Sequence, residues 1–141
     1  MTLFLSKALL AKIAEHGEQA YPDEGAGFLL GHGDAERVIN DLLFAANKRE
    51  ISARSRRYLI DPREYMDAEM ESERRGLDLV GVFHSHPDHP NAPSEYDREW
   101  AQPVFSYVIT SIRAGKAGES RSWRLDDCRN EFVEEEIQIT D

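Results

Sequence analysis

Residues 79–87 read Leu-Val-Gly-Val-Phe-His-Ser-His-Pro, an apolar run that passes directly into two histidines and a proline. The apolar run predicts a buried strand over residues 79–83, which brings His84 to the end of that strand. His84 and His86 are two positions apart, so their side chains point to the same side of an extended segment. Three prolines between residues 87 and 93 then predict a stiff loop.

A possible third metal ligand follows this loop. Ser94 and Asp97 complete the pattern H-x-H-x10-D, with the serine three residues before the aspartate. Two imidazoles and one carboxylate leave the fourth tetrahedral position of zinc open to water, which is typical of a catalytic site. Zinc lowers the pKa of a bound water to about 7. The pattern therefore predicts a hydrolytic zinc site with His84, His86 and Asp97 as its ligands.

Ser94 and Asp97 also have an ordinary structural explanation. Ser94 can cap a short helix that runs to about Gln102, and the helix dipole favours an acidic residue in its first turn. Their spacing is that of a capping box, with Asp in place of the usual Glu. The two roles are compatible, because a cap would fix the direction in which Asp97 points. The Ser94 hydroxyl could still face the reacting water or the developing oxyanion.

The other three histidines are expected to lie outside the ligand set. His16 and His32 each stand alone, and a lone histidine is usually a surface residue or a hydrogen-bonded core residue. His89 is a possible competing ligand, but it lies within the proline-rich loop.

A zinc hydrolase also needs a general base that is not a ligand. Glu24 is the best candidate, because the small residues at positions 25–27 would let its carboxylate approach a neighbouring strand. Asp23 is nearly as good on this reasoning. Both could equally belong to a solvated acidic turn.

The remaining pattern alternates helices and strands. The expected elements are a helix from Ser6 to about Ala20, strands over 25–31 and 37–43 joined by a turn at Gly33-Asp34, a loop over 47–57, a strand over 58–60, a helix from Pro62 to about Arg75 capped by Asp61, a strand over 104–111 and a closing hairpin of 121–125 and 131–139. This order predicts a single α/β or α+β domain over residues 1–141, with a mixed or antiparallel sheet flanked by helices.

Composition narrows the possible partners. The chain has 141 residues, 40% hydrophobic and 31% charged, which is typical of one globular domain. Its formal net charge is −10, whereas nucleic-acid-binding proteins usually carry the opposite balance, so no nucleic-acid partner is expected. The basic run Arg54, Arg56 and Arg57 is expected to be a solvated loop.

Membrane association is not expected, because no apolar run approaches the roughly 20 residues that a membrane helix requires. The first ten residues contain only Lys7 as a basic residue, and no secretory signal is predicted. Cys128 is the only cysteine, which excludes an internal disulfide and a zinc site built on several thiolates. A cytoplasmic location is therefore expected. The sequence does not predict an oligomeric state.

Taken together, these motifs resemble those of the JAMM (MPN-plus, Mov34-type) metalloprotease family, in its short prokaryotic members. The matching features are Glu24, the run Gly27–Gly31, the run Val82–Pro87, Ser94 and Asp97. The resemblance extends over residues 21–112, and the combined motif is highly specific. One departure is Ala26, where relatives often carry serine or cysteine, but this position is not a ligand.

The resemblance implies a zinc isopeptidase fold, a mixed curved sheet flanked by helices and similar to that of cytidine deaminases. It implies His84, His86 and Asp97 as Zn²⁺ ligands and Ser94 as a stabiliser of the tetrahedral intermediate. It also implies Glu24 as the acid/base, in preference to its acidic neighbour. In this mechanism Glu24 takes a proton from the attacking water and passes it to the leaving amine.

The family also implies a class of substrate. Its members typically cleave after the C-terminal Gly-Gly tail of ubiquitin or ubiquitin-like proteins. Short bacterial relatives trim sulfur-carrier proteins of ubiquitin-like fold, for example by releasing a C-terminal cysteine. The chain is too short for the insertions that grip a ubiquitin chain, so a sulfur carrier is the expected partner. Two alternatives stay open: a non-catalytic MPN-type interaction scaffold, and a JAMM-like peptidase acting on cell-wall or phage-tail peptides.

Overall fold

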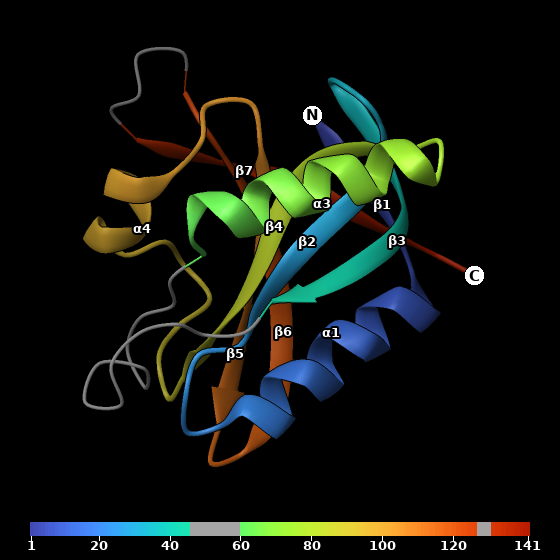
Figure 1. The fold of residues 1–141 in the computed structure, drawn as a ribbon. Coiled ribbons are helices and arrows are strands. Elements are labelled where there is room, and N and C mark those ends of the chain that lie inside the picture. The colour runs from blue at the N-terminus through green and yellow to red at the C-terminus, as the bar shows by residue number, and fades with distance from the viewer. Residues whose placement is uncertain (46–59, 127–130) are drawn as a thin grey trace.

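The computed structural model describes residues 1–45, 60–126 and 131–141 (Figure 1). In chain order the elements of these segments are β1 (Thr2–Ser6), α1 (Lys7–Ala20), β2 (Ala26–Gly33), β3 (Glu36–Ala45), α3 (Pro62–Arg74), β4 (Asp78–Pro87), α4 (Glu95–Trp100), β5 (Ser106–Arg113), β6 (Lys116–Leu125) and β7 (Phe132–Thr140). None of the described helices is long and apolar enough to cross a membrane.

The described strands form one mixed sheet that closes on itself in the order β1-β3-β2-β4-β5-β6-β7. β4 lies between β2, to which it is antiparallel, and β5, to which it is parallel. β1 completes the closure, because it pairs in parallel with both β3 and β7. The expected mixed α+β fold is confirmed. The closure was not expected, since β1 alternates over only five residues and merges into the start of α1.

β4 is longer than predicted and contains the whole His-Ser-His-Pro run. Its parallel pairing with β5 continues as far as Pro87, which lies opposite Ile112. Proline is tolerated there because the pairing of β4 with β2 ends at Ser85, so position 87 lies on an unpaired edge on that side. The next residue, Asp88, still donates its N–H to the carbonyl of Ile112 at 2.7 Å. Both histidines are therefore held on a regular strand rather than on a loop.

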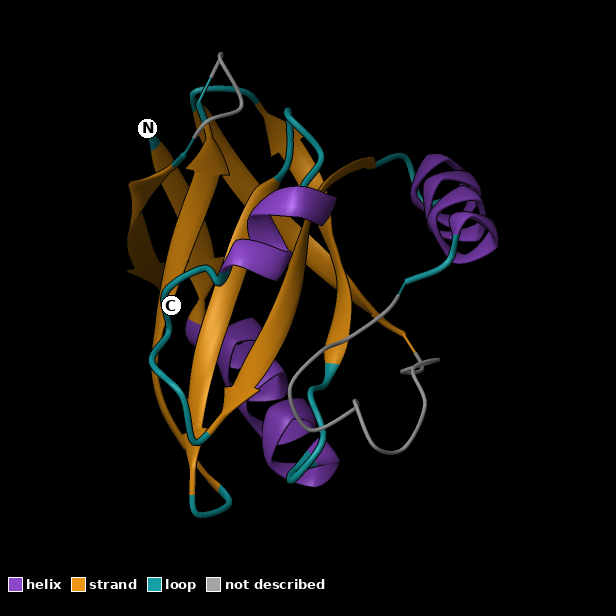
Figure 2. Ribbon diagram, turned by 90° about the vertical axis from the view of Figure 1, so that its left-hand side faces the viewer, coloured by secondary structure: helices purple, strands orange, loops and turns teal. Residues whose placement is uncertain are grey.

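The apolar run of β4 is continuous because both faces of the strand are buried. Val82 belongs to a core cluster that includes Ala68 of α3. Its neighbour Phe83 belongs to a second cluster that includes Ile13 of α1. Figure 2 shows α1, α3 and α4 separated from one another around the barrel. Successive side chains of β4 thus belong to core clusters that include different helices.

The predicted helix starts are confirmed. Ser6 and Asp61 cap α1 and α3 by accepting the backbone N–H groups of Leu9 and Glu64. At Ser94 both halves of a capping box are present. α4 ends earlier than expected, at Trp100 rather than at about residue 102.

The largest errors of prediction lie after α4. β5 begins at Ser106 rather than at residue 104, and Val104 is exposed. β6 begins at Lys116 rather than at residue 121. Ala114 and Gly115 take positive φ angles and form a tight turn between β5 and β6. The sequence analysis did not predict this turn.

Some predictions fall outside the described residues. These are the loop over 47–57 with its arginine run, Tyr58 and Leu59 of the predicted strand, and Cys128. The third residue of that predicted strand, Ile60, is described; it is buried but not part of a strand.

Candidate metal centre

Three side chains converge beside the end of β4. The Nε2 atoms of His84 and His86 are 3.1 Å apart. Asp97 places Oδ2 at 3.1 Å from His86 Nε2 and Oδ1 at 3.4 Å from His84 Nε2. Zinc bonds of about 2.0–2.1 Å put tetrahedral ligand atoms about 3.3–3.4 Å apart. The structure therefore brings the three predicted ligands together at a spacing that fits one zinc-sized ion.

Local structure explains this convergence. His84 and His86 share a face of β4, and the capping box of α4 aims Asp97 at them. Asp97 N–H donates to Ser94 Oγ at 3.1 Å, and Ser94 N–H donates to Asp97 Oδ2 at 2.8 Å. The oxygen that closes the capping box is the same oxygen that faces His86. The capping geometry is thus compatible with the predicted ligand role of Asp97.

The proline-rich loop orients the second histidine. His86 Nδ1 lies 2.7 Å from the carbonyl oxygen of Pro90. A carbonyl oxygen only accepts hydrogen bonds, so Nδ1 carries a proton and donates it to Pro90, and Nε2 is the ring nitrogen that faces Asp97 and His84. Hydrogen bonding of the remote ring nitrogen is the usual outer contact of a metal-bound histidine.

Burial and charge shift the pKa values of His84 and Asp97. Burial lowers the pKa of His84 below its ordinary value, although Asp97 acts in the opposite direction. Burial alone would raise the pKa of Asp97, but the adjacent His84 and His86 outweigh it and hold that pKa well below its usual range. A neutral imidazole and an ionised carboxylate are the forms that bind a metal. The donor set therefore suits a divalent cation at neutral pH.

Glu24 lies beside the same group. It is 2% exposed and immediately precedes the backbone that leads into β2. Its carboxylate and the ring nitrogens of His84 and His86 offer ligand atoms within 4.8 Å of one another. Asp23 is only half-buried. The structure thus brings Glu24 to the histidines, and the assignment of base and ligand roles stays a prediction.

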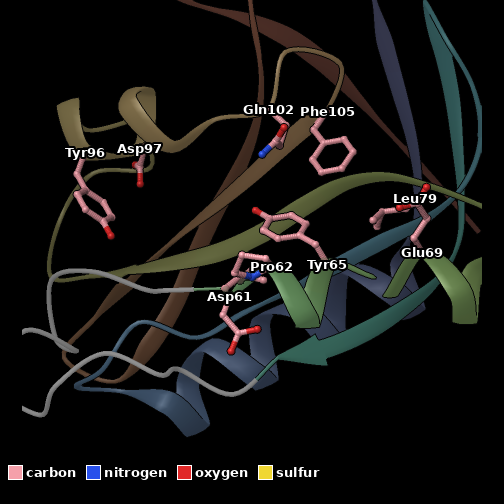
Figure 3. A pocket seen from close by; sticks show the side chains of 10 residues that line it. Asp61, Pro62, Tyr65, Glu69, Leu79, Tyr96, Asp97, Gln102 and Phe105 are labelled. Atoms are coloured by element: carbon pink, nitrogen blue, oxygen red, sulfur yellow. The ribbon is translucent and has the colours of Figure 1, made fainter. Parts of the chain in front are cut away.

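Two cavities are lined in part by residues of the cluster. One, of about 520 Å³, is lined by Glu24, His86, Ser94 and the proline-rich loop, including the exposed His89. The other, also of about 520 Å³, is lined largely by apolar and aromatic side chains of α3, α4 and their flanking segments. Figure 3 shows Tyr96 and Asp97 on one side of this second cavity.

The apolar cavity was not foreseen. Tyr65 of α3 and Phe105, just before β5, line it opposite α4 (Figure 3). Burial, aided by neighbouring Glu64, raises the pKa of Tyr65 to about 12, so its hydroxyl stays protonated. Tyr65 and Phe105 lie 40 positions apart in the sequence and belong to no common motif. Their proximity therefore could not be predicted from a local sequence pattern.

The two lone histidines lie elsewhere. His32 is exposed and stands 3.4 Å from Asp78. His16, on α1, packs its ring against the rings of Phe44 and Phe83.

The sequence matches a known protein family. The match covers residues 6–126 and is to the prokaryotic homologs of the JAB domain. It includes every residue of the candidate metal centre.

Two relatives of known description are similar over most of their length. One is named a probable TtuB-protein conjugate cleaving protease, from Thermus thermophilus; it is 34% identical over 117 residues, 81% of this chain and 75% of that protein. The other is named a desampylase, from Pyrococcus furiosus; it is 30% identical over 118 residues, 82% of this chain and 76% of that protein.

Solved structures agree with this assignment. A protein from Desulfitobacterium hafniense superimposes with a TM-score of 0.84 and 28% identity, covering 100% of this chain and 94% of that one. A structure described as JAMM, a metalloprotease-like zinc site in the proteasome and signalosome, shares the fold at a TM-score of 0.57 and 20% identity, covering 98% and 99%. The resemblance to JAMM proteins is thus confirmed, and the chain belongs to the prokaryotic homologs of the JAB domain and is a hydrolase of that family.

Proposed function

We propose that the chain is a zinc-dependent peptidase or isopeptidase that hydrolyses the bond after the C-terminal Gly-Gly tail of a ubiquitin-like protein, namely a bacterial sulfur carrier. The convergence of His84, His86 and Asp97, with Glu24 beside them, is the observation that carries this proposal. In it the first three residues hold Zn²⁺, Glu24 is the acid/base, and Ser94 is the oxyanion stabiliser.

Each residue has a definite task in the reaction. Zinc, when bound, lowers the pKa of water and polarises the scissile carbonyl. The Glu24 carboxylate accepts one proton from the attacking water and delivers it to the leaving nitrogen, as the new C–O bond forms and the C–N bond breaks. Ser94 Oγ already accepts the N–H of Asp97, so its own proton is available for the developing oxyanion.

Several features support a flexible glycine-rich tail as the substrate. Glu24, His84, His86 and Asp97 are each less than 8% exposed, so a segment without side chains would approach them with the fewest clashes. The apolar cavity beside Asp97 offers a place for the residues that precede the glycines. One relative is named for cleaving conjugates between TtuB and other proteins, which supports an attached small protein as the substrate.

A cleavage assay with a matched variant tests the proposal. The host's own sulfur carrier, extended by a C-terminal cysteine, is incubated with the zinc-loaded chain, and its intact mass is measured. We expect the added residue to be lost with the wild type. We expect Glu24→Gln to retain zinc by metal analysis and to lose about 100- to 10,000-fold in rate, the range typical of acid–base catalysis.

Each other outcome has a clear meaning. Cleavage by zinc-loaded Glu24→Gln would reject Glu24 as the base. If zinc-loaded wild type leaves the carrier intact but cuts cell-wall or phage-tail peptides, the substrate class is wrong. A chain that takes up no zinc even from supplemented buffer would refute the metal site and favour the scaffold alternative.

A further inference from the structure

Ser85 stands between the two histidines but faces the other side of β4. It is 3% exposed, and its Cβ lies close to α1 at Gly17, where an added methyl group would come within 3.2 Å of it. Alternation along the strand therefore directs Ser85 away from the metal centre and toward α1. The mechanism above uses both of its neighbours and gives Ser85 no task.

Ser85 makes two hydrogen bonds to one residue, Gly25. The N–H of Ser85 donates to the Gly25 carbonyl at 2.9 Å, as an antiparallel ladder requires. The N–H of Gly25 donates at 2.8 Å to the side-chain Oγ of Ser85, rather than to a backbone carbonyl. Regular pairing of β2 begins only at the next residue, where Ala26 lies opposite His84. A side chain thus supplies the hydrogen bond that extends the pairing by one residue.

α1 also packs against Gly25. A Cβ on Gly25 would lie 3.0 Å from the Cβ of Ala20 and 3.1 Å from Cδ2 of His16. These distances are tighter than ordinary van der Waals contact, so α1 packs directly against this backbone. Gly25 is therefore packed against α1 and hydrogen-bonded to β4, and Ser85 is the side chain that supplies one of these bonds.

The residue immediately before Gly25 is Glu24. We propose that Ser85 is a positioning residue that fixes the Glu24 carboxylate relative to His84 and His86, by acting through the backbone of Gly25. This inference rests on the proposed role of Glu24 as the base. Ser85 belongs to the strand that carries both histidines, so its bond ties the base and two ligands to one rigid element.

A second hydrogen bond holds Tyr21, which begins the segment between α1 and β2 that contains Glu24 and Gly25. Tyr21 donates its hydroxyl proton to Asp88 Oδ2 at 2.6 Å, and Asp88 Oδ1 accepts the N–H of Ala114 at 2.9 Å. This contact is exposed, whereas the Ser85 contact is buried. Water can replace the exposed bond more easily, so the buried bond at Gly25 is expected to dominate the position of Glu24.

The test compares variants of two buried serines. Ser85→Ala removes the acceptor of the Gly25 N–H, Ser85→Thr keeps a hydroxyl, and Ser85→Cys keeps the volume with a weak acceptor. Ser72→Ala is the matched control, because Ser72 is 2% exposed and its hydroxyl donates to a carbonyl within α3. Cleavage of the cysteine-extended sulfur carrier gives kcat and KM, and metal analysis gives the zinc content.

We expect Ser85→Ala to lower kcat about 10- to 100-fold with KM and zinc content unchanged, because small misplacement of a catalytic group costs rate rather than binding. Ser85→Thr should recover kcat to within about 3-fold of wild type, and Ser85→Cys should fall between. Ser72→Ala should leave kcat unchanged. Wild-type kcat in folded Ser85→Ala, or in Ser85→Cys should the alanine variant not fold, would overturn the proposal. So would an equal loss in Ser72→Ala.

Amide hydrogen exchange separates this inference from the proposed function. The Gly25 amide should exchange at least 10-fold faster in Ser85→Ala than in wild type, whether or not the carrier is cleaved. Unchanged exchange at Gly25 would refute the bond to Ser85. If the wild type does not cleave the carrier but Gly25 exchanges faster in Ser85→Ala, the proposed substrate is wrong and the Ser85–Gly25 hydrogen bond is supported. The kcat comparison would then be made with another cleavable tail.

Discussion

At the residue scale, two glycines allow the strands around the candidate metal centre to pair closely. A Cβ on Gly27 would lie 2.4 Å from the carbonyl oxygen of Leu43, and one on Gly81 would lie 2.2 Å from that of Ser106. Both neighbours are backbone atoms of paired strands, which cannot turn aside as a flexible side chain can. Glycine is therefore required at these positions by close approach rather than by a positive φ angle.

Gly81→Ala tests this requirement just before the two histidines. The new methyl group would push β4 away from β5, and overpacking of this kind typically costs about 1–3 kcal/mol. We expect a lower free energy of unfolding in urea and a lower zinc content. Gly118→Ala is the control, because its Cβ would meet nothing closer than 3.5 Å and should change stability by less than about 0.5 kcal/mol. Equal effects of the two substitutions would contradict the close-approach argument.

His16 is a second residue whose surroundings lead to a prediction. Burial lowers its pKa below the ordinary value of 6.5, although a backbone hydrogen bond at Ala26 acts in the opposite direction. The unfolded chain therefore binds a proton at a higher pH than the folded chain, and stability falls as pH decreases from 6.5 through the lowered pKa. In His16→Gln the free energy of unfolding should depend less steeply on pH over this range. An identical slope in both proteins would show that His16 does not titrate as its burial requires.

At the scale of elements, β6 and β7 are joined by a buried ionic contact. Arg124 Nε donates to Glu135 Oε1 at 2.7 Å, and Ser122 Oγ donates to Glu135 Oε2 at 2.7 Å. Arg124 and Glu135 are 7% and 2% exposed. Beside them Arg121 and Glu134 form a second pair across the same two strands, but both side chains are at least one-third exposed. The two pairs thus differ in burial while sharing strands and charges.

This difference predicts unequal effects of two neighbouring substitutions. Glu135→Ala leaves Arg124 buried without its carboxylate, which typically costs about 3–5 kcal/mol. Glu134→Ala removes an exposed partner, which typically costs about 0–1 kcal/mol. Urea unfolding of both variants gives the comparison. Similar losses would mean that solvent reaches Glu135 and Glu134 equally.

At the scale of the whole molecule, the candidate metal centre connects separate elements. His84 and His86 lie on β4, Asp97 on α4, and Glu24 before β2. A metal ion there would bind the folded chain and not the unfolded one. Such a ligand stabilises by about 4 kcal/mol at 1,000 times its dissociation constant.

Removal of the metal should therefore lower thermal stability. Chelation of zinc-loaded protein is expected to reduce Tm by on the order of 10 °C, since about 2–4 °C corresponds to each kcal/mol in a domain of this size. Adding zinc back should restore Tm. Asp97→Ala should show little response to zinc, because it lacks one of three ligands. A wild type whose Tm ignores both chelator and zinc would contradict the proposed site.

Much of the site could be predicted from the sequence because its geometry is local. The i, i+2 spacing of His84 and His86 on a strand determines that their side chains share a face. The capping box of Ser94 and Asp97 determines where α4 begins and which way the carboxylate points. The helix starts at Ser6 and Asp61 follow from the same kind of short-range hydrogen bond.

Contacts between distant segments were decided by the tertiary structure alone. The bonds of Ser85 to Gly25 span 60 positions, and they depend on the register of β2 against β4. The same register brings Glu24 to the histidines while leaving Asp23 half-buried. The closure by β1 and the cavity between Tyr65 and Phe105 also arise from the packing of remote elements. The spacing of the ligands and the helix caps follow from the sequence, because both depend on backbone geometry within a few residues. The contacts between distant residues depend on the burial of both faces of β4. That burial is a property of the whole fold, because it requires elements from all parts of the chain.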